Sequence, residues 1–102
     1  MLDVEARRDG DVVRLILRGE LDLATVPIVS AKIQEACKAN PTALVLDFGD
    51  LAFCDSSGVR EVIAAADNCR EQDVKFSVVD TRPNVRRIFE ISGLADLLND
   101  NT

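Results

Sequence analysis

The sequence contains no histidine, no tryptophan and no tyrosine, and these absences exclude several kinds of site. Without histidine, the chain has no Ser/His/Asp or Cys/His nucleophilic centre and no histidine-ligated metal. Phenylalanine supplies the entire aromatic content of 4%, which is too little for the stacking platforms that bind single-stranded nucleic acid or sugars. We therefore expect an aliphatic core and no histidine-dependent hydrolase.

Positive charge and long apolar runs are also scarce. The chain has 12 Lys and Arg against 18 Asp and Glu, for a net charge of -6. Phosphate backbones and anionic membranes repel such a protein on average, so no direct nucleic-acid or membrane partner is expected. No stretch approaches the ~18 apolar residues of a membrane span, and the first residues lack the apolar run of a signal peptide. These features predict a cytoplasmic protein.

The three cysteines, Cys37, Cys54 and Cys69, cannot all pair within one chain and show no CxxC spacing. This usage fits a reducing compartment, and we interpret the thiols as buried and inert. Neither GxxxxGKS nor GxGxxG occurs, so no nucleotide or other cofactor is predicted. Asp47 and Asp50 are interpreted as loop solvation rather than as a metal site.

The length of 102 residues and the hydrophobic content of 47% suit one domain over residues 1–102, with Asn99–Thr102 as a frayed tail. Apolar residues alternate with polar ones on both sides of Asp9-Gly10, which predicts a β-hairpin. Helical spacing then runs from a Thr25 N-cap to Asn40-Pro41. The short apolar run 43–46 predicts a central strand.

A second helix is predicted to begin at Asp55-Ser56-Ser57, with Val59 and Cys69 on its apolar face. A strand over 75–79 and a helix from Pro83 to Ser92-Gly93 follow, and then a short helical turn. A hairpin followed by alternating helices and strands indicates an α/β fold. We expect a mixed four- to five-stranded sheet, parallel crossovers and three to four helices.

Functional groups in open α/β sheets gather at the carboxyl ends of strands. Two segments are expected there side by side, Gly19–Asp22 and Asp50–Gly58. The hydroxyls of Ser56 and Ser57 open a helix, and on spacing alone helix capping is the commoner role. The alternative is regulatory phosphorylation, which would place a phosphate beside helix N–H groups and change the charge of the surface.

Three motifs together resemble the STAS domain of bacterial anti-sigma factor antagonists. They are Gly19-Glu20-Leu21-Asp22, Phe53-Cys54-Asp55-Ser56-Ser57-Gly58-Val59 and Asn84-Val85-Arg86-Arg87-Ile88-Phe89-Glu90-Ile91-Ser92-Gly93-Leu94. They agree with the family in order and spacing, over essentially the whole chain. The resemblance implies a STAS-like fold and a protein that binds an anti-sigma factor and so frees a sigma factor.

In that family the anti-sigma factor is a serine kinase of the histidine-kinase-like ATPase type. It phosphorylates the antagonist and expels it, and a separate phosphatase reverses the modification. The first serine of the Asp-Ser-Ser-Gly motif is the acceptor, which carries over to Ser56, with Asp55, Ser57 and Gly58 as its motif neighbours. Asp22 matches an acidic position near the partner surface of the family, and we predict that Glu20, Val59 and Arg60 also contact the partner. Arg60 departs from the family, in which a small residue is common at this position, and is either a specificity determinant or a solvated charge.

Other interpretations remain open from the sequence. The chain could be a STAS subunit of a larger assembly, either a stressosome-like signalling complex or a lipid-transport complex. A phospho-aspartate receiver with Asp47 as the acceptor is less well supported, because the expected acidic cluster and late lysine are missing. An enzyme with Ser56 as nucleophile would need a lysine base that no motif supplies, so we predict no enzyme. The free protein is expected to be a monomer.

Overall fold

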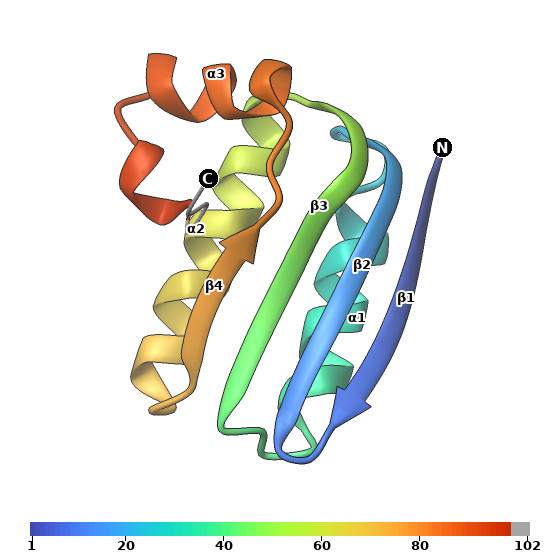
Figure 1. Ribbon diagram of the computed structural model, residues 1–102, viewed down its shortest axis with the longest axis vertical. Helices are drawn as coiled ribbons and strands as arrows, with labels where there is room; N and C mark the ends of the chain where they lie inside the picture. The colour runs from blue at the N-terminus through green and yellow to red at the C-terminus, as the bar shows by residue number, and fades with distance from the viewer. Residues whose placement is uncertain (99–102) are drawn as a thin grey trace.

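A computed structural model describes residues 1–98, in which four strands form one sheet in the order β1-β2-β3-β4 (Figure 1). The elements are β1 (Leu2–Asp9), β2 (Val12–Leu21), α1 (Val26–Cys37), β3 (Ala43–Cys54), α2 (Ser56–Glu71), β4 (Lys75–Val79), α3 (Pro83–Ile91) and the 3-10 turn η1 (Ala95–Leu97). The predicted tail Asn99–Thr102 lies outside the described residues. β1 pairs antiparallel with β2, whereas β2, β3 and β4 are parallel. The predicted mixed α/β fold is confirmed.

The connections follow from local sequence. β1 and β2 pair from Leu2↔Gly19 to Asp9↔Val12, and the turn between them contains Gly10 at φ +61. A positive φ is favourable for glycine and costly for most other residues. The parallel strands then need long crossovers, which α1 and α2 provide.

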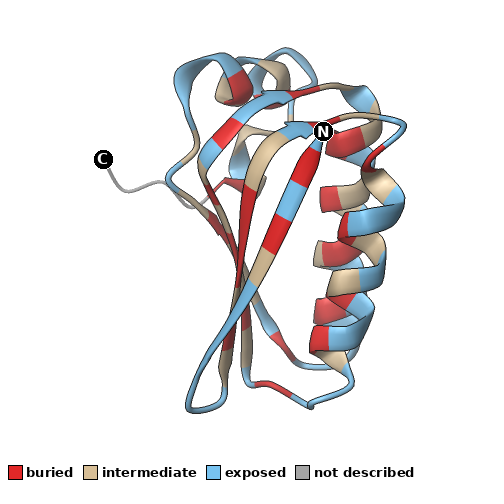
Figure 2. Cartoon of the chain, turned by 90° about the vertical axis from the view of Figure 1, so that its right-hand side faces the viewer, coloured by how far each residue is buried: buried red, intermediate tan, exposed pale blue. Residues whose placement is uncertain are grey.

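The helices cover one face of the sheet, and the core lies between the two layers (Figure 2). The sheet contributes alternating residues such as Leu15 and Leu17, while α2 contributes Val62. The rings of Phe48 and Phe89 meet in this core with their centroids 6.5 Å apart. The remaining core is mainly aliphatic, as expected. No helix within residues 1–98 is long and apolar enough to cross a membrane.

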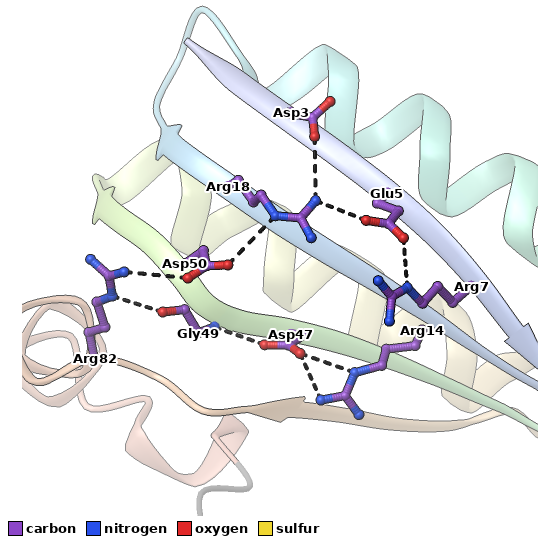
Figure 3. Close-up of polar contacts among 9 residues, drawn as sticks. All are labelled: Asp3, Glu5, Arg7, Arg14, Arg18, Asp47, Gly49, Asp50 and Arg82. Atoms are coloured by element: carbon purple, nitrogen blue, oxygen red, sulfur yellow. Dashed lines mark hydrogen bonds and ion pairs between the residues drawn. The ribbon is translucent and has the colours of Figure 1, made fainter.

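The other face of the sheet carries interleaved charges instead of a second layer (Figure 3). Arg14 Nη2 lies 2.7 Å from Asp47 Oδ2, and Arg18 Nη1 lies 3.0 Å from Glu5 Oε1. Ile16 is only 8% exposed between these two arginines of β2. Exposed ion pairs add little stability individually. Their main effect is to keep this face polar.

β3 is longer than the sequence predicts, because it continues through Asp50 to Cys54 rather than ending near Asp47. Its pairing with β2 shifts twice, once between Ile16 and Arg18 and once between Gly19 and Glu20. These bulges interrupt the alternation of buried and exposed residues on which the prediction depended. The Gly19–Asp22 segment was likewise expected in a loop, but β2 includes it as far as Leu21.

Candidate functional site

β2 and β3 end together at one edge of the sheet (Figure 1). Leu21 is paired with Cys54 in the last register position, and the Asp55 N–H donates to the Leu21 carbonyl at 3.1 Å. The loop after β2 and the start of α2 therefore leave the sheet from adjacent positions. The two predicted segments meet here, although both are largely strand.

Asp55 is the N-cap of α2, and its carboxylate makes two hydrogen bonds. Asp55 Oδ1 accepts from the Ser57 N–H at 2.9 Å and from the Gly58 N–H at 3.1 Å. These two donors would otherwise lack partners in the first turn of the helix. Capping is therefore the role of Asp55, and Ser56 is exposed at the first position of the helix.

The cap also bears on the electrostatics of a phosphate at this position. A phosphate on Ser56 was expected to lie beside helix N–H groups and to change the charge of the surface. The N–H groups of Ser57 and Gly58 already bind Asp55, so the added charge would lie beside a carboxylate. Like charges at such short range repel each other. Phosphorylation here would sharpen a negative surface rather than neutralise a positive one.

Replacing Asp55 by alanine is expected to destabilise the protein by about 1 kcal/mol, because two N–H groups lose their acceptor. Urea unfolding followed by circular dichroism measures the change. Asp67→Ala is the matched control, since Asp67 lies on the same helix and forms only an exposed ion pair with Arg70. Equal effects of the two substitutions would contradict the capping role.

Gly58 brings α2 close to the ends of β2 and β3. A Cβ at this position would lie 2.6 Å from Cys54 Sγ and 2.8 Å from Leu21 Cγ. Real Cβ atoms essentially never lie this close to other heavy atoms, so with any larger residue α2 or the buried side chains of Cys54 and Leu21 would have to move. Gly58 is therefore needed for the close approach that presents Ser56 at this edge.

Cys54 is part of the same packing and is 1% exposed. Burial, together with the nearby Asp55 carboxylate, raises the pKa of the Cys54 thiol to about 12. A thiol with such a pKa is a poor nucleophile at neutral pH. Cys54 acts as a small apolar side chain in this site.

A second turn, from Asp22 to Thr25, shapes the loop after β2. Asp22 Oδ1 accepts from the Thr25 N–H at 3.0 Å, and the Thr25 hydroxyl accepts from the Asp22 N–H at 2.9 Å. The same hydroxyl donates to the Glu20 carbonyl at 2.9 Å. Thr25 was predicted to cap α1, but its side chain makes no cap hydrogen bond and ties the loop to β2 instead.

Apolar side chains are exposed around this edge, which sequence reasoning did not single out. Leu23 is 73% exposed, Phe53 is 47% exposed and Ile28 is 42% exposed. Leu23 follows β2, and Phe53 pairs with Glu20 at the end of β3. Leu23, Ile28 and Phe53 are called the apolar rim below. The sequence signal that could have revealed the apolar rim was a large apolar residue within a segment otherwise rich in charged residues.

The four predicted partner residues differ in how exposed they are. Glu20 and Arg60 are exposed, and Asp22 is half-buried. Val59 is 3% exposed and packs in the core, so it does not belong to a partner surface in this structure. Its place on the apolar face of α2 overrides the partner role that was predicted for it. Within residues 1–98, no group of three or more Cys, Asp or Glu side chains is placed to hold a metal ion.

Two side chains at the start of α3 form hydrogen bonds with the last part of β3. Asn84 Nδ2 donates to the Ala52 carbonyl at 2.7 Å, and Arg82 Nε donates to the Gly49 carbonyl at 2.8 Å. These bonds hold the final, bulged part of β3, which leads directly into Asp55 and Ser56. Asn84 is thus a positioning residue that the sequence placed in a motif without assigning a role.

Comparison with known proteins supports the resemblance to the STAS domain. The family described as "Mlab, STAS domain" matches residues 4–99. RsfB, an anti-sigma-F factor antagonist of Mycobacterium tuberculosis, is 37% identical over 83 residues, which are 81% of this chain and 67% of RsfB. The chain belongs to the STAS-domain family of anti-sigma factor antagonists.

Two solved structures extend the comparison to the whole STAS domain. The anti-sigma factor antagonist SpoIIAA in its unphosphorylated form superposes with a TM-score of 0.84 at 29% identity, covering 98% of this chain and 89% of that one. The phosphorylated form of SpoIIAA, a Bacillus cell fate determinant, has a TM-score of 0.75 at 28% identity, covering 98% and 92%. The fold of this STAS domain is thus shared with a protein known in both states.

Family membership and the structure answer two questions that the sequence left open: whether the chain is an enzyme and whether it is a phospho-aspartate receiver. Anti-sigma factor antagonists are regulatory proteins rather than enzymes, which confirms that prediction. The receiver hypothesis is wrong, because Asp47 lies within β3 and not at its carboxyl end. The Asp47 carboxylate is bound to Arg14 and to the Gly49 N–H at 2.9 Å. It stabilises a bulge in the STAS sheet.

Proposed function

We propose that this STAS domain binds a serine-kinase anti-sigma factor and so releases a sigma factor, and that phosphorylation of Ser56 ends this binding. The observation that carries the proposal is the exposed Ser56 at the first position of α2, next to an Asp55 that alone provides the cap. A residue that is exposed and not needed for the cap can be modified without unfolding the helix.

The surroundings of Ser56 suit a protein partner. The apolar rim supplies area that gains free energy when a partner covers it, at roughly 25 cal/mol per Å². Glu20 and Asp22 add negative charge on one side, and Arg60 adds positive charge on the next part of α2. A mixture of apolar and charged groups is typical of interfaces that must form and separate.

The switch needs little energy. A phosphoserine carries about -1.5 to -2 charges at neutral pH, and here it would lie beside the Asp55 carboxylate. A hundredfold loss of affinity corresponds to only about 2.7 kcal/mol. Repulsion and desolvation of one phosphate at an interface are sufficient for this effect. No refolding of the domain is required.

The remaining chemistry belongs to the partners. The kinase binds ATP and transfers its terminal phosphoryl group to Ser56. A separate phosphatase removes the phosphoryl group from Ser56. We place these reactions in the cytoplasm. The partner residues on this chain are Glu20, Asp22 and Arg60, together with the apolar rim.

The test is a capture experiment from the native host with wild-type, Ser56→Ala and Ser56→Asp proteins as baits, with the bound proteins identified by mass spectrometry. The proposal predicts that an ATPase-type anti-sigma factor binds Ser56→Ala and is lost from Ser56→Asp. The same partners on all three baits would contradict the switch. That result would favour the alternative of a subunit in a larger signalling or transport assembly.

A further inference from the structure

β1 is an edge strand, and no strand within residues 1–98 pairs with its outer side (Figure 1). It runs over eight residues, Leu2–Asp9, and pairs with β2 in one unbroken register without a bulge or a proline. Short length, bulges and proline are common features that keep an edge strand from pairing with another chain. β4, at the opposite edge, has only five residues. β1 is therefore the edge that can accept a further strand.

The direction of the backbone groups of β1 follows from its register. The Glu20 N–H donates to the Met1 carbonyl at 2.9 Å, so these two residues occupy a hydrogen-bonded position of the antiparallel ladder. Hydrogen-bonded positions alternate with positions at which the N–H and C=O groups point away from the paired strand. Odd-numbered residues of β1 therefore bond to β2. The residues with outward N–H and C=O groups are Leu2, Val4, Ala6 and Arg8.

The side chains of β1 are divided between the two faces of the sheet. Glu5 and Arg7 lie on the charged face (Figure 3), where Arg7 Nε is 2.6 Å from Glu5 Oε2. Ala6 lies on the face that carries the helices and is exposed. Beside Ala6, a groove of about 180 Å³ opens between β1 and α1. Its lining includes Val13 and Ala36, and charged side chains of β1 and α1 border it.

We propose that two copies of this chain pair antiparallel through β1, with a two-fold axis at Ala6, and so join their sheets into one. This dimer does not depend on the phosphorylation switch. The axis places Ala6 opposite Ala6 of the second copy, and Val4 opposite Arg8 of the second copy. Because all these residues have outward N–H and C=O groups, each pair closes two hydrogen bonds. The monomer expected from the sequence is then the form at low concentration.

The charges of β1 select this register over its neighbours. With the axis at Ala6, Glu5 lies opposite Arg7 of the second copy, and this pair occurs twice. An axis at Glu5 would set Glu5 opposite itself, and an axis at Arg7 would set Arg7 opposite itself. Opposite charges that face each other across a strand pair stabilise it, whereas like charges destabilise it. The like-charged Asp3 and Asp9 face each other only at the two ends of the pairing, farthest from the axis.

We expect the dimer to be weak and to leave the Ser56 sites apart. Two joined edge strands bury less area than the roughly 1,600 Å² of a standard interface, and the net charge of -6 on each chain opposes association. Each Ser56 site lies at the Leu2 end of β1, because Met1 bonds to Glu20 near the end of β2. In an antiparallel dimer these two ends point in opposite directions, so the two Ser56 sites do not face each other.

Sedimentation velocity of the wild-type chain, from about 10 µM to about 1 mM, covers the range in which weak complexes form. The proposal predicts a sedimentation coefficient that rises with concentration for the wild type and stays at the monomer value for Ala6→Pro. Proline removes the outward N–H of Ala6 but no bond between β1 and β2, so the fold should survive, as circular dichroism can check. Ala6→Ser is the matched control, because it keeps the N–H and should still associate.

Two charge reversals test the register itself. Glu5→Arg opposes two arginines at each pair, and Arg7→Glu opposes two glutamates, so each variant alone should dimerise about tenfold more weakly than the wild type. An equimolar mixture of the two variants restores both opposite-charge pairs. The mixed dimer should therefore form about as well as the wild-type dimer, and native mass spectrometry distinguishes it from the two homodimers by mass.

A wild-type chain that remains monomeric at about 1 mM would overturn the proposal, since even weak specific complexes form in this range. Association that survives Ala6→Pro would place the contact elsewhere on the surface and would overturn it too. A mixture of the two charge variants that associates no better than either variant alone would contradict the register with its axis at Ala6. Because the mixing experiment does not use Ala6→Pro, the proposal can be tested even if that variant folds poorly.

Discussion

The Ser56→Asp variant is expected to bind the anti-sigma factor about a hundredfold more weakly than the wild-type protein, which corresponds to about 2.7 kcal/mol. Aspartate at this position places a second carboxylate beside Asp55, whose own carboxylate is fixed by the Ser57 and Gly58 N–H groups. An interface that covers both charges must desolvate them without new partners. Ser56→Ala should bind as tightly as the wild type, since Asp55 provides the cap.

Isothermal titration calorimetry with the purified anti-sigma factor measures these affinities. Asn68→Asp is the matched control, because it adds the same charge to an exposed position near the other end of α2. The control should change affinity only slightly and should lose even that effect at high salt. Equal weakening by Ser56→Asp and Asn68→Asp would mean that overall charge, not the site, controls binding.

The Gly58→Ala variant is expected to lose about 2 kcal/mol of stability. Alanine is the better helix former by about 1 kcal/mol, so a helix free to move would gain stability. Here the new Cβ would lie 2.6 Å from Cys54 Sγ and 2.8 Å from Leu21 Cγ. Overpacking a tight contact forces the first turn of α2 outward. The same movement displaces Ser56 and should weaken partner binding.

A double-mutant cycle separates the contact from other effects of the substitution. Cys54→Ala removes the sulfur that the new Cβ approaches, so Gly58→Ala should cost clearly less in that background. Urea unfolding of the four proteins gives the coupling energy. A Gly58→Ala variant more stable than the wild type would contradict the close approach of α2 to the strand ends.

The regular parts of the fold could be predicted because their periodicity is simple. The hairpin around Gly10 and the apolar face of α2 follow from alternation and helical spacing. β3 could not be predicted beyond Asp47, since two bulges break the alternation and place Leu51 and Cys54 in the core. Bulges depend on pairing with β2, which local sequence does not encode.

The functional site likewise contains some residues whose roles could be predicted from the sequence and others whose roles could not. Asp55 at the N-cap and Gly58 at a close approach could be expected from the motif. The placement of Val59 on a partner surface was wrong, and helical spacing had already assigned this residue to the core. Thr25 and Asn84 act through hydrogen bonds to the carbonyls of Glu20 and Ala52. The contact of Asn84 joins residues that are 32 positions apart, and the choice of acceptor carbonyl in both cases depends on the assembled fold.

The most direct measurement incubates the protein with its purified anti-sigma factor and ATP and maps the phosphate by mass spectrometry. The tryptic peptide 39–60 contains both Ser56 and Ser57, so fragmentation within it distinguishes the two. We predict one acid-stable phosphate on Ser56 and release of the anti-sigma factor as it accumulates. Phosphate on Ser57 instead, or a phosphorylated protein that stays bound, would contradict a switch at Ser56.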